Sequence, residues 1–258
     1  MIRFALLAAL AFSLLAQCTF AQIPGNVMSR VYQIRVPAGT ATSFILEHGD
    51  KQYIFTANHV VEDLGDHAKV EIMSDGKWVS LGVRILHGDS KCEDVAVLIP
   101  DQKEQLLKAD ALPELKNFYI GQEAYFLGYP YGLVMQAAAV HLSAALVKHA
   151  YISAVVKCSD VNPGAPEDKN VILLDGFNNP GFSGGPVVSK NLDDPNHPFN
   201  VVGIISGFRF ENTPVSVNGQ KAPGASVQSN TGIIVAVGID RAFALIEADK
   251  AKSAAPKQ

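Results

Sequence analysis

Ser183 lies in the segment Gly-Phe-Ser-Gly-Gly-Pro-Val, residues 181–187, which places three glycines and a proline around one hydroxyl. Glycine loses the most backbone freedom on folding, so this cluster indicates unusual backbone angles or close approach of the backbone to a ligand. A serine nucleophile requires such surroundings, because backbone N–H groups must converge on the oxygen that becomes negative during acyl transfer. The segment predicts Ser183 as a nucleophile, with the amides of Gly181 and Ser183 as oxyanion donors. A glycine-rich turn between strands is the alternative, and the partners of the serine decide between the two.

A serine hydroxyl is a weak nucleophile unless a base takes its proton, and the usual base is histidine. His59 follows an apolar strand segment in Phe-Thr-Ala-Asn-His-Val-Val, residues 55–61, and the end of a strand holds a side chain rigidly. We therefore expect His59 to be the base. His141 and His149, in the second set of predicted strands, are the other candidates. The remaining histidines lie in turns or polar loops: His48, His67, His87 and His197.

An acid beside the histidine must orient the imidazole and stabilise its protonated form. Asp94 leads directly into the apolar segment Val-Ala-Val-Leu, residues 95–98, so its carboxylate can be drawn into the core. We expect Asp94 to be this acid, and Asp89 and Glu93 to be solvated neighbours. A charged strand end on the surface is the default for any single acid, so the prediction depends on the combination with the histidine and the serine.

The three segments resemble the histidine, aspartate and serine motifs of the trypsin-like (chymotrypsin-fold) serine peptidases, in that family's order. The resemblance places His59 and Asp94 in a first barrel and Ser183 in a second, with the active site in the cleft between them. Within the family the chain is most similar to the bacterial HtrA-type proteases. This similarity lies in the approach to the serine at residues 175–181 and in Gly-Ile-Ile-Val-Ala-Val at 232–237.

The chain departs from related sequences in several ways. No room remains for the PDZ module that usually follows the protease domain of HtrA-type proteins, and Asn58 precedes the histidine where many vertebrate-type members have alanine. In digestive members an aspartate precedes the serine and pairs with a newly cut N-terminal ammonium. Here that residue is Phe182, which cannot pair with a charge. The resemblance therefore predicts no activation by insertion of a trimmed N-terminus.

The resemblance also implies a primary specificity pocket with its base at Phe177 and its wall along Ser206, Gly207 and Phe208. No acidic residue occupies position 177. Desolvating a substrate cation without a partner costs several kcal/mol, so cleavage after lysine or arginine is disfavoured. The expected residue at the cleavage site is uncharged, and small and aliphatic if Phe177 or Phe208 narrows the pocket.

The elements that must position these residues are short strands separated by turns. Apolar runs and turn signals predict strands in two sets, the first at 31–36, 40–47, 52–57, 70–73, 78–86 and 95–99 and the second at 123–127, 136–157, 171–174, 186–189, 201–205 and 233–237. Residues 136–157 form either two strands or one long bent strand. Regularly spaced short strands favour a sandwich or barrel. Together with the resemblance, they predict an all-β fold of two antiparallel six-stranded-type β-barrels (chymotrypsin-like) with a C-terminal helix.

The predicted peptidase domain covers residues 22–258. It comprises an N-terminal barrel at about 28–100, a linker at 101–118, a C-terminal barrel at 119–238 and a closing helix at 240–250. Asp240 has the character of a helix N-cap. Residues 191–200 and 211–230 contain proline, glycine and many polar residues, so we expect both to be surface loops.

Residues 1–21 have the pattern of a secretory signal peptide, with Arg3 near the start, an apolar stretch, and small residues at the end. The apolar run is short for the ~20 residues of a membrane span. We therefore expect an exported chain, periplasmic or secreted, with no membrane association after cleavage. Cys18 invites a lipoprotein interpretation, but the glutamine before it is a poor match to such sites. Spacing alone does not show whether Cys92 and Cys158 form a disulfide.

Composition narrows the possible functions. A net charge of −4 and the lack of a Lys/Arg block argue against a nucleic-acid partner, and 48% hydrophobic residues allow a substantial core. No metal or cofactor is expected, because the sequence has neither a His-Glu-x-x-His motif nor a Cys/His ligand set. An esterase of the α/β-hydrolase type would carry its triad in another order. The prediction is an exported serine endopeptidase that cleaves protein or peptide substrates. The alternative is a weakly active or inactive protease-fold protein with a binding or chaperone-like role. The oligomeric state stays open.

Overall fold

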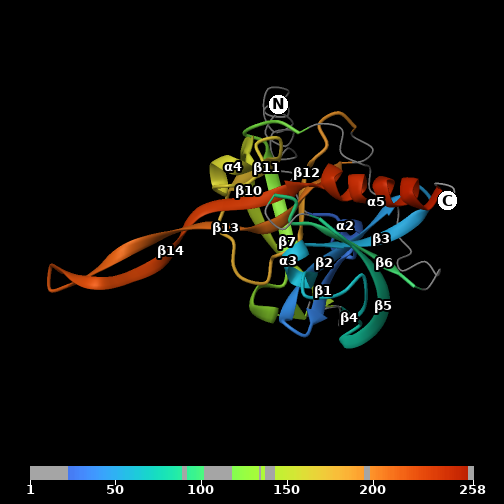
Figure 1. The fold of residues 1–258 in the computed structure, drawn as a ribbon, viewed down its shortest axis with the longest axis horizontal. Helices are drawn as coiled ribbons and strands as arrows, with labels where there is room; N and C mark the ends of the chain where they lie inside the picture. Colours follow the sequence, from blue (N-terminus) through green and yellow to red (C-terminus); the bar gives the residue numbers. More distant parts are fainter. Residues whose placement is uncertain are drawn as a thin grey trace, which may run out of the picture.

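The computed structural model describes residues 23–88, 92–101, 118–133, 135–136, 143–194 and 198–254. Within these residues the chain forms two closed antiparallel barrels and a C-terminal helix (Figure 1), which confirms the predicted fold class. The predicted signal peptide lies outside the described residues, as do Cys18, Asp89 and all of the predicted linker except its two ends.

The first barrel has the strand order β1–β2–β3–β6–β5–β4. Alternate residues of a strand point to opposite faces, so each strand contributes branched apolar side chains to the interior, among them Ile34, Ile54 and Leu98. Two single-turn helices belong to this half, α2 (Gly25–Met28) before the barrel and α3 (Asn58–Val61) directly after β3. The strands are β1 (Val31–Val36), β2 (Gly39–His48), β3 (Lys51–Thr56), β4 (His67–Ser74), β5 (Lys77–His87) and β6 (Ala96–Pro100).

The second barrel has the strand order β10–β11–β14–β13–β12–β7. Its interior contains Phe126, Ile152, Leu174 and Phe182. The barrel strands are β7 (Glu123–Gly128), β10 (Leu146–Lys157), β11 (Asn170–Asp175), β12 (Pro186–Lys190), β13 (Phe199–Val217) and β14 (Gln220–Gly238). Smaller elements connect them: the 3-10 turn η1 (Pro130–Gly132), the short strand pair β8 (Met135–Gln136) and β9 (Ser143–Ala144), and helix α4 (Cys158–Val161).

The two barrels share an apolar core, so the loops that face each other between them are held in a fixed relation. One buried cluster combines Phe44 and Phe55 of the first barrel with Leu127 and Tyr129 of the second. The hydroxyl of Tyr129 donates a hydrogen bond to the carbonyl of Val31 at 3.0 Å. Burial raises the pKa of Tyr129 to about 12, which keeps this hydroxyl a donor.

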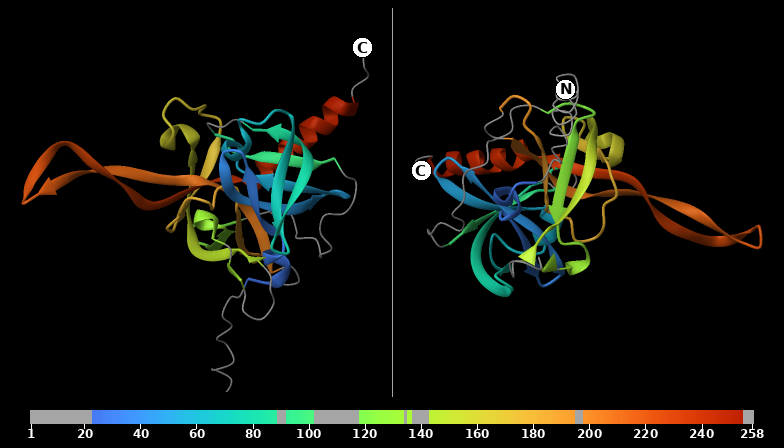
Figure 2. Two further views of the ribbon diagram at one scale, coloured as in Figure 1. Left: turned by 90° about the horizontal axis from the view of Figure 1, so that it is seen from below. Right: turned by 180° about the vertical axis from the view of Figure 1, so that it is seen from behind.

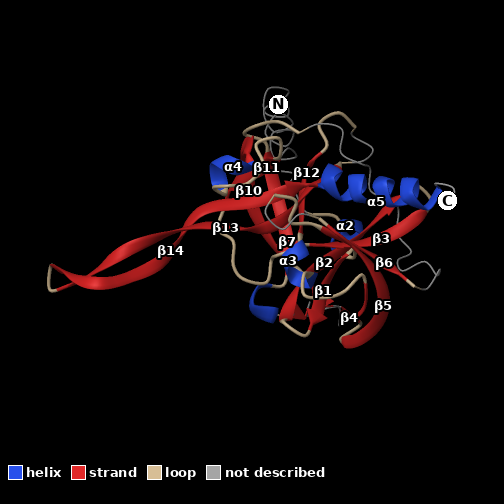
Figure 3. Cartoon of the chain, viewed as in Figure 1, coloured by secondary structure: helices blue, strands red, loops and turns tan. Residues whose placement is uncertain are grey.

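Helix α5 (Ile239–Ala254) closes the chain against the first barrel (Figure 3). Arg84 of β5 makes two hydrogen bonds of 2.7 Å to the carboxylate of Asp249, and Phe243 packs edge-on against Phe55. The helix begins one residue earlier than predicted, so Asp240 lies in its first turn instead of capping it. Among the described residues, no helix has the length and apolarity needed to cross a membrane.

Cys92 and Cys158 form a disulfide across the two barrels, a pairing that the sequence left open. Their Cα atoms are 5.7 Å apart although the residues are separated by 66 positions. The bond connects the segment just before Asp94 to helix α4 of the second barrel. It therefore ties a predicted site residue to the barrel that carries the predicted nucleophile.

The prediction that residues 211–230 form a surface loop is wrong. Strands β13 and β14 stay paired from Gly203 and Gly238 out to Val217 and Gln220. The resulting hairpin projects far from both barrels (Figures 1 and 2). Asn218 and Gly219 form its turn with φ values of 50° and 78°, and two-residue turns with positive φ match the twist of paired strands. We call residues 210–230 of this hairpin the arm.

Candidate active site

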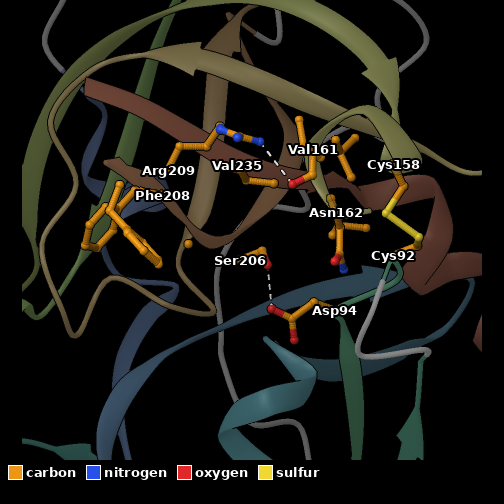
Figure 4. A pocket seen from close by; sticks show the side chains of 13 residues that line it. Cys92, Asp94, Cys158, Val161, Asn162, Ser206, Phe208, Arg209 and Val235 are labelled. Atoms are coloured by element: carbon orange, nitrogen blue, oxygen red, sulfur yellow. Dashed lines mark hydrogen bonds between the residues drawn. A yellow bond between two sulfur atoms is a disulfide. The ribbon is translucent and has the colours of Figure 1, made fainter. Parts of the chain in front are cut away.

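Asp94 lies two residues before the start of β6, and its carboxylate accepts three hydrogen bonds. Oδ1 accepts from the backbone N–H of His59 at 2.8 Å, and Oδ2 accepts from the ring Nδ1 of His59 at 2.7 Å. Oδ2 also accepts from the hydroxyl of Ser206 at 2.5 Å (Figure 4). With the residue only 6% exposed, these donors fix the position of a buried carboxylate beside the imidazole.

His59 lies on α3, directly after β3, with its side chain 40% exposed. Because Nδ1 donates to Asp94, the lone pair of the neutral ring lies on Nε2, which is the atom that can take a proton. Burial by itself lowers the pKa of His59, but the hydrogen bond to Asp94 and the charges of Asp94 and Glu62 outweigh it. The pKa of His59 is therefore raised above its ordinary value.

Ser183 precedes β12 and lies in the second barrel. Its Oγ donates to the carbonyl of Ser206 at 3.5 Å, and among the described residues it has no hydrogen bond to His59. His59 and Ser183 nevertheless line one pocket of about 180 Å³, with Gly181 and residues 38–41 of the first barrel. Hydrogen bonds between a nucleophile and its base are often long without substrate and tighten when the substrate binds.

The backbone before Ser183 forms a tight turn from Asn179 to Phe182, closed by a 3.3 Å hydrogen bond from the N–H of Phe182 to the carbonyl of Asn179. Gly181 has φ 102°, which is the left-handed region that this turn position requires and glycine allows. The carbonyl of Pro180 accepts a 2.8 Å hydrogen bond from the N–H of Tyr131. Because a peptide is planar, this contact directs the N–H of Gly181 to the opposite side.

The turn therefore leaves two backbone donors uncommitted. Among the described residues, the N–H groups of Gly181 and Ser183 have no backbone or side-chain acceptor. Both residues line the pocket that also contains His59. Donors that need no rearrangement are what stabilisation of a developing oxyanion requires.

Thr42 of β2 holds this loop against the first barrel, a role that the sequence reasoning missed. Its N–H donates to the carbonyl of Ser183 at 3.0 Å, and its hydroxyl donates to the carbonyl of Gly181 at 2.7 Å. The same hydroxyl accepts from the N–H of Tyr129 at 3.0 Å. A threonine within an apolar strand carries no signal of such contacts, because its partners are remote in the chain.

Lys148 of β10 is a second missed residue. Its ammonium donates to the carbonyl of Phe177 and, at 3.0 Å, to Oδ1 of Asn179. Burial lowers the pKa of Lys148. A lysine side chain thus contacts the segment that leads into the turn.

Phe182, the residue before Ser183, is uncharged and was expected not to pair with an N-terminal ammonium. Its side chain is fully buried and packs against Phe126 with ring centroids 4.9 Å apart.

The predicted pocket residues fall in two places. Ser206, Gly207 and Phe208 line a pocket of about 450 Å³ between β13, helix α4 and the disulfide (Figure 4). This larger pocket includes Asp94 but neither His59 nor Ser183. Phe177 lines neither pocket; it is 54% exposed, and the ammonium of Lys148 lies 5.4 Å from the centre of its ring. Phe177 thus lies outside both pockets, although the side chain of the next residue, Asn178, donates to the carbonyl of Gly207 at 3.3 Å.

Three of the other described histidines have partners away from Ser183, and the fourth, His67, begins strand β4. His149 contacts Glu123 at 2.9 Å, and His87 contacts Asn58 at 2.8 Å. His48 lies against Glu247 of α5. His141 and His197 lie outside the described residues. Within the described ranges, no three His, Cys, Asp or Glu residues are grouped closely enough to hold a metal ion.

Two six-stranded antiparallel barrels with a shared core, and with the predicted site residues contributed by both, define a chymotrypsin-like fold. The chain belongs to the family described as the trypsin-like peptidase domain, whose model matches residues 41–193, more than half of its 258 residues. No curated protein sequence matches it. Within the described residues no PDZ module follows the second barrel.

Solved structures share the fold. The inactive form of the Ser343Ala mutant of Rv3671c from M. tuberculosis H37Rv has 17% identity and a TM-score of 0.53, covering 89% of each chain. The serine endoprotease from Yersinia pestis has 19% identity and a TM-score of 0.53, covering 88% of this chain and 67% of the other. The HtrA-type protease AlgW with tripeptide has 22% identity and a TM-score of 0.52, covering 86% and 62%.

Proposed function

We propose that the chain is an exported serine endopeptidase that hydrolyses peptide bonds through Ser183, His59 and Asp94. The observation that carries the proposal is the hydrogen bond of 2.7 Å between His59 and the buried Asp94, together with the pocket that both His59 and Ser183 line. Membership of the trypsin-like peptidase domain family supports a peptidase. The similarity to HtrA-type structures supports protein or peptide substrates.

In this mechanism Nε2 of His59 takes the proton of Ser183 as Oγ attacks the peptide carbonyl, and Asp94 stabilises the imidazolium. The N–H groups of Gly181 and Ser183 receive the oxyanion, and a donor of this kind is worth about 2.7–4 kcal/mol in the transition state. His59 then protonates the leaving amine. Water, activated by the same imidazole, hydrolyses the acyl-enzyme and regenerates the serine.

Specificity for basic residues is not part of the proposal. The charged group found next to Phe177 is the ammonium of Lys148, which repels a second cation. We propose uncharged residues at the cleavage site instead. Cleavage after lysine by the purified protein in a mixed peptide library would overturn this part.

The proposal is tested by labelling with a fluorophosphonate, which reacts only with an activated serine. We expect the wild type to be labelled and Ser183→Ala to be unlabelled while retaining its circular dichroism spectrum. Ser153→Ala is the matched control, because the hydroxyl of Ser153 is exposed and bonds only locally to the carbonyl of Tyr151. A folded wild type that stays unlabelled and cleaves no peptide would favour the binding-protein alternative.

Export is proposed from residues 1–21 alone. The test is the mass of the mature protein after expression of the full sequence in a Gram-negative host. A periplasmic or secreted form that begins at Gln22 supports the proposal. A full-length form retained in the cytoplasm contradicts it.

A further inference from the structure

The arm, residues 210–230 of β13 and β14, extends away from both barrels (Figure 2). Among the described residues, no side-chain hydrogen bond or ion pair joins residues 211–229 to the rest of the chain. On β14 the residues from Pro223 to Gln228 are all exposed, on both faces of the hairpin. A two-stranded hairpin without a packed face is marginally stable in water. A further strand added to the arm would therefore stabilise it.

The root of the arm is hydrogen-bonded to the body of the protein, so the arm has a fixed direction. The guanidinium of Arg209 donates to the carbonyl of Val161 in α4 at 3.0 Å (Figure 4). The hydroxyl of Thr231 donates to the carbonyl of Arg209 at 2.9 Å, and the side-chain amide of Asn230 donates to the carbonyl of Asn178 at 2.8 Å. Because the root is held, a partner strand has to order only the outer part of the arm.

The outer edge of β14 carries backbone groups that face away from β13. Pro214 of β13 lies opposite Ser226 of β14. Proline has no N–H, so this pair does not exchange hydrogen bonds, and the N–H and C=O of Ser226 point away from β13. The register continues without a bulge to Asn212 opposite Gln228, two residues along each strand. Gln228 therefore presents its N–H and C=O on the same edge.

This edge is occupied near the barrels and ends near the tip of the arm. Strand β11 pairs with the inner part of β14, and the N–H of Gly176 donates to the carbonyl of Gly232 at 2.9 Å. Toward the tip, Pro223 and Gly224, which has a φ of 74°, interrupt the regular strand. Among the described residues, no other strand pairs with β14 on this side between these limits. We call residues 225–229 the β14 edge.

The β14 edge is suited to a second copy of the chain, because it carries no charge. No charged residue occurs from Ala222 to Gly238. Natural proteins prevent the pairing of exposed edges by placing charged side chains on them, among other devices. In a two-fold symmetric pair each residue beside the axis meets its own copy, so a charged residue there would face a like charge. An uncharged edge avoids this repulsion.

The opposite edge of the hairpin, on β13, is less suited to a second copy. It carries Arg209 and Glu211, and also Pro214, whose missing N–H would face the added strand. Its inner end lies at Ser206, whose carbonyl accepts from Ser183 at 3.5 Å. A second copy paired there would lie across the approach to the nucleophile. The β14 edge lies on the other side of the hairpin.

We infer that two copies of the chain associate by antiparallel pairing of their β14 edges about a two-fold axis at Val227. The two arms then form one four-stranded sheet. Ser226 exchanges two backbone hydrogen bonds with Gln228 of the partner subunit, and Gln228 does the same with the partner's Ser226. Val227 lies opposite the partner's Val227 in a pair without hydrogen bonds, where side chains approach most closely. This contact covers an apolar side chain that is 56% exposed in the single chain.

An interface of this size predicts weak, reversible association. Five residues from each arm bury far less than the roughly 800 Å² per partner of a standard protein interface. The dimer should therefore dissociate on dilution. Its formation requires neither the catalytic residues nor a substrate, so self-association of this kind is independent of peptidase activity.

Matched proline substitutions test the edge, in the full chain carrying Ser183→Ala to prevent self-cleavage. Gln228→Pro and Asn212→Pro change residues that lie opposite each other, and each removes an N–H from an outer edge but none from the ladder between β13 and β14. In sedimentation velocity over a concentration series, we expect the parent and Asn212→Pro to dimerise with the same dissociation constant. Gln228→Pro should raise this constant about tenfold or more, because each copy loses a hydrogen bond to the other.

A thiol at the axis locates the contact even if a proline disturbs the arm. Val227→Cys and Thr213→Cys also change residues that lie opposite each other. Both are made with Cys18→Ser, since Cys92 and Cys158 are already bonded. Across the axis the two Cα atoms of residue 227 should lie about 4.5 Å apart, within the range of a disulfide. We expect mild oxidation to convert Val227→Cys into a covalent dimer, and Thr213→Cys to cross-link at least about tenfold less.

A parent protein that stays monomeric up to about 1 mM would overturn the inference. Equal effects of the two prolines, or equal cross-linking of the two cysteine variants, would overturn it as well, because the contact would then lie elsewhere. Assemblies that grow beyond a dimer would also contradict it, since pairing about a two-fold axis closes at two copies.

Discussion

The two halves of the candidate site are held in place by different kinds of interaction. In the first barrel, His59 and Asp94 are fixed by hydrogen bonds in which side chains take part, at 2.7 and 2.8 Å. In the second barrel, Ser183 is fixed by the conformation of the backbone around it, with Gly181 at φ 102° and Gly184 at φ 83°. The first half therefore depends on the chemistry of particular side chains. The second depends on glycines and on the loops that hold their peptides.

The contacts between the halves follow the same division. Asp94 receives the hydroxyl of Ser206 from the second barrel, whereas Ser183 is held by the N–H of Thr42 from the first. Each barrel thus supplies a hydrogen-bond donor to a site residue of the other barrel. Substitutions in the first half should change catalysis more than folding, and substitutions in the second half should change both.

The largest effect is expected from Asp94→Asn. An amide in place of the carboxylate presents a donor to Nδ1 of His59 and favours the wrong tautomer, with a loss of about 10⁴-fold in kcat. Steady-state kinetics measures the effect on catalysis, and thermal unfolding measures the effect on folding. The melting temperature should change little. Glu93→Gln is the control, since Glu93 pairs with Lys169 at 2.7 Å and not with His59. A similar loss in both variants would contradict the assignment.

Gly184→Ala should disturb both the fold and the activity. A Cβ at this position meets the carbonyl of Thr42, the hydroxyl of Thr56 and, at 2.8 Å, the N of Ala57, at a φ of 83°. We expect a loss of about 3 kcal/mol or more in the free energy of unfolding. Gly224→Ala has a similar φ of 74° but nothing within 4 Å, so it should cost only about 1–2 kcal/mol. Urea denaturation of both variants tests the comparison, and equal losses would exclude steric crowding as the cause.

Lys148→Met removes the ammonium that holds Phe177 and Asn179 but keeps an apolar side chain against the neighbouring rings. The turn that orients Gly181 loses a support, and we expect kcat to fall about tenfold. Lys157→Met on the same strand removes an exposed pair with Glu167 at 3.5 Å and should leave kcat unchanged. A wild-type kcat for Lys148→Met would show that the turn needs no cation.

The smallest of the predicted effects is a shift in the pH dependence of kcat/KM, which is set by His59. The pKa of His59 is raised, so the protonated ring is favoured in the folded state, and its contribution to stability is lost as pH rises through that pKa. Catalysis needs the neutral ring, so kcat/KM should fall on the acid side at a pH above the ordinary pKa of histidine. Glu62→Gln removes one of the charges that raise the pKa and should move this limb to lower pH. Added salt should also move the acid side of the wild-type kcat/KM profile to lower pH. A profile that changes neither with salt nor with Glu62→Gln would contradict an electrostatic origin of the raised pKa.

Much of the fold could be predicted from the sequence because it rests on local signals. Apolar runs between turn residues located the strands of both barrels, among them β1 at Val31–Val36 as predicted. The arm was not predicted, because its residues are polar and contain Pro214 and Pro223. Its one local signal was the Asn218-Gly219 pair, which is typical of a hairpin turn.

Some residues of the candidate site could be predicted from the sequence, and others could not. His59, Asp94 and Ser183 were named from short motifs, and the structure places His59 in contact with Asp94 and in one pocket with Ser183. Thr42 and Lys148 were not named. Their partners lie 139 and 31 positions away, and no local pattern indicates contacts at such distances.

By itself, the sequence determined which residues can do chemistry and that short strands carry them, because side-chain type and apolar alternation act within a few residues. Only the tertiary structure decided that Thr42 and Tyr131 orient the turn before Ser183, that Cys92 meets Cys158, and that β13 continues past the site into the arm. These features depend on how two closed barrels pack against each other, and that packing is set by the shared core as a whole.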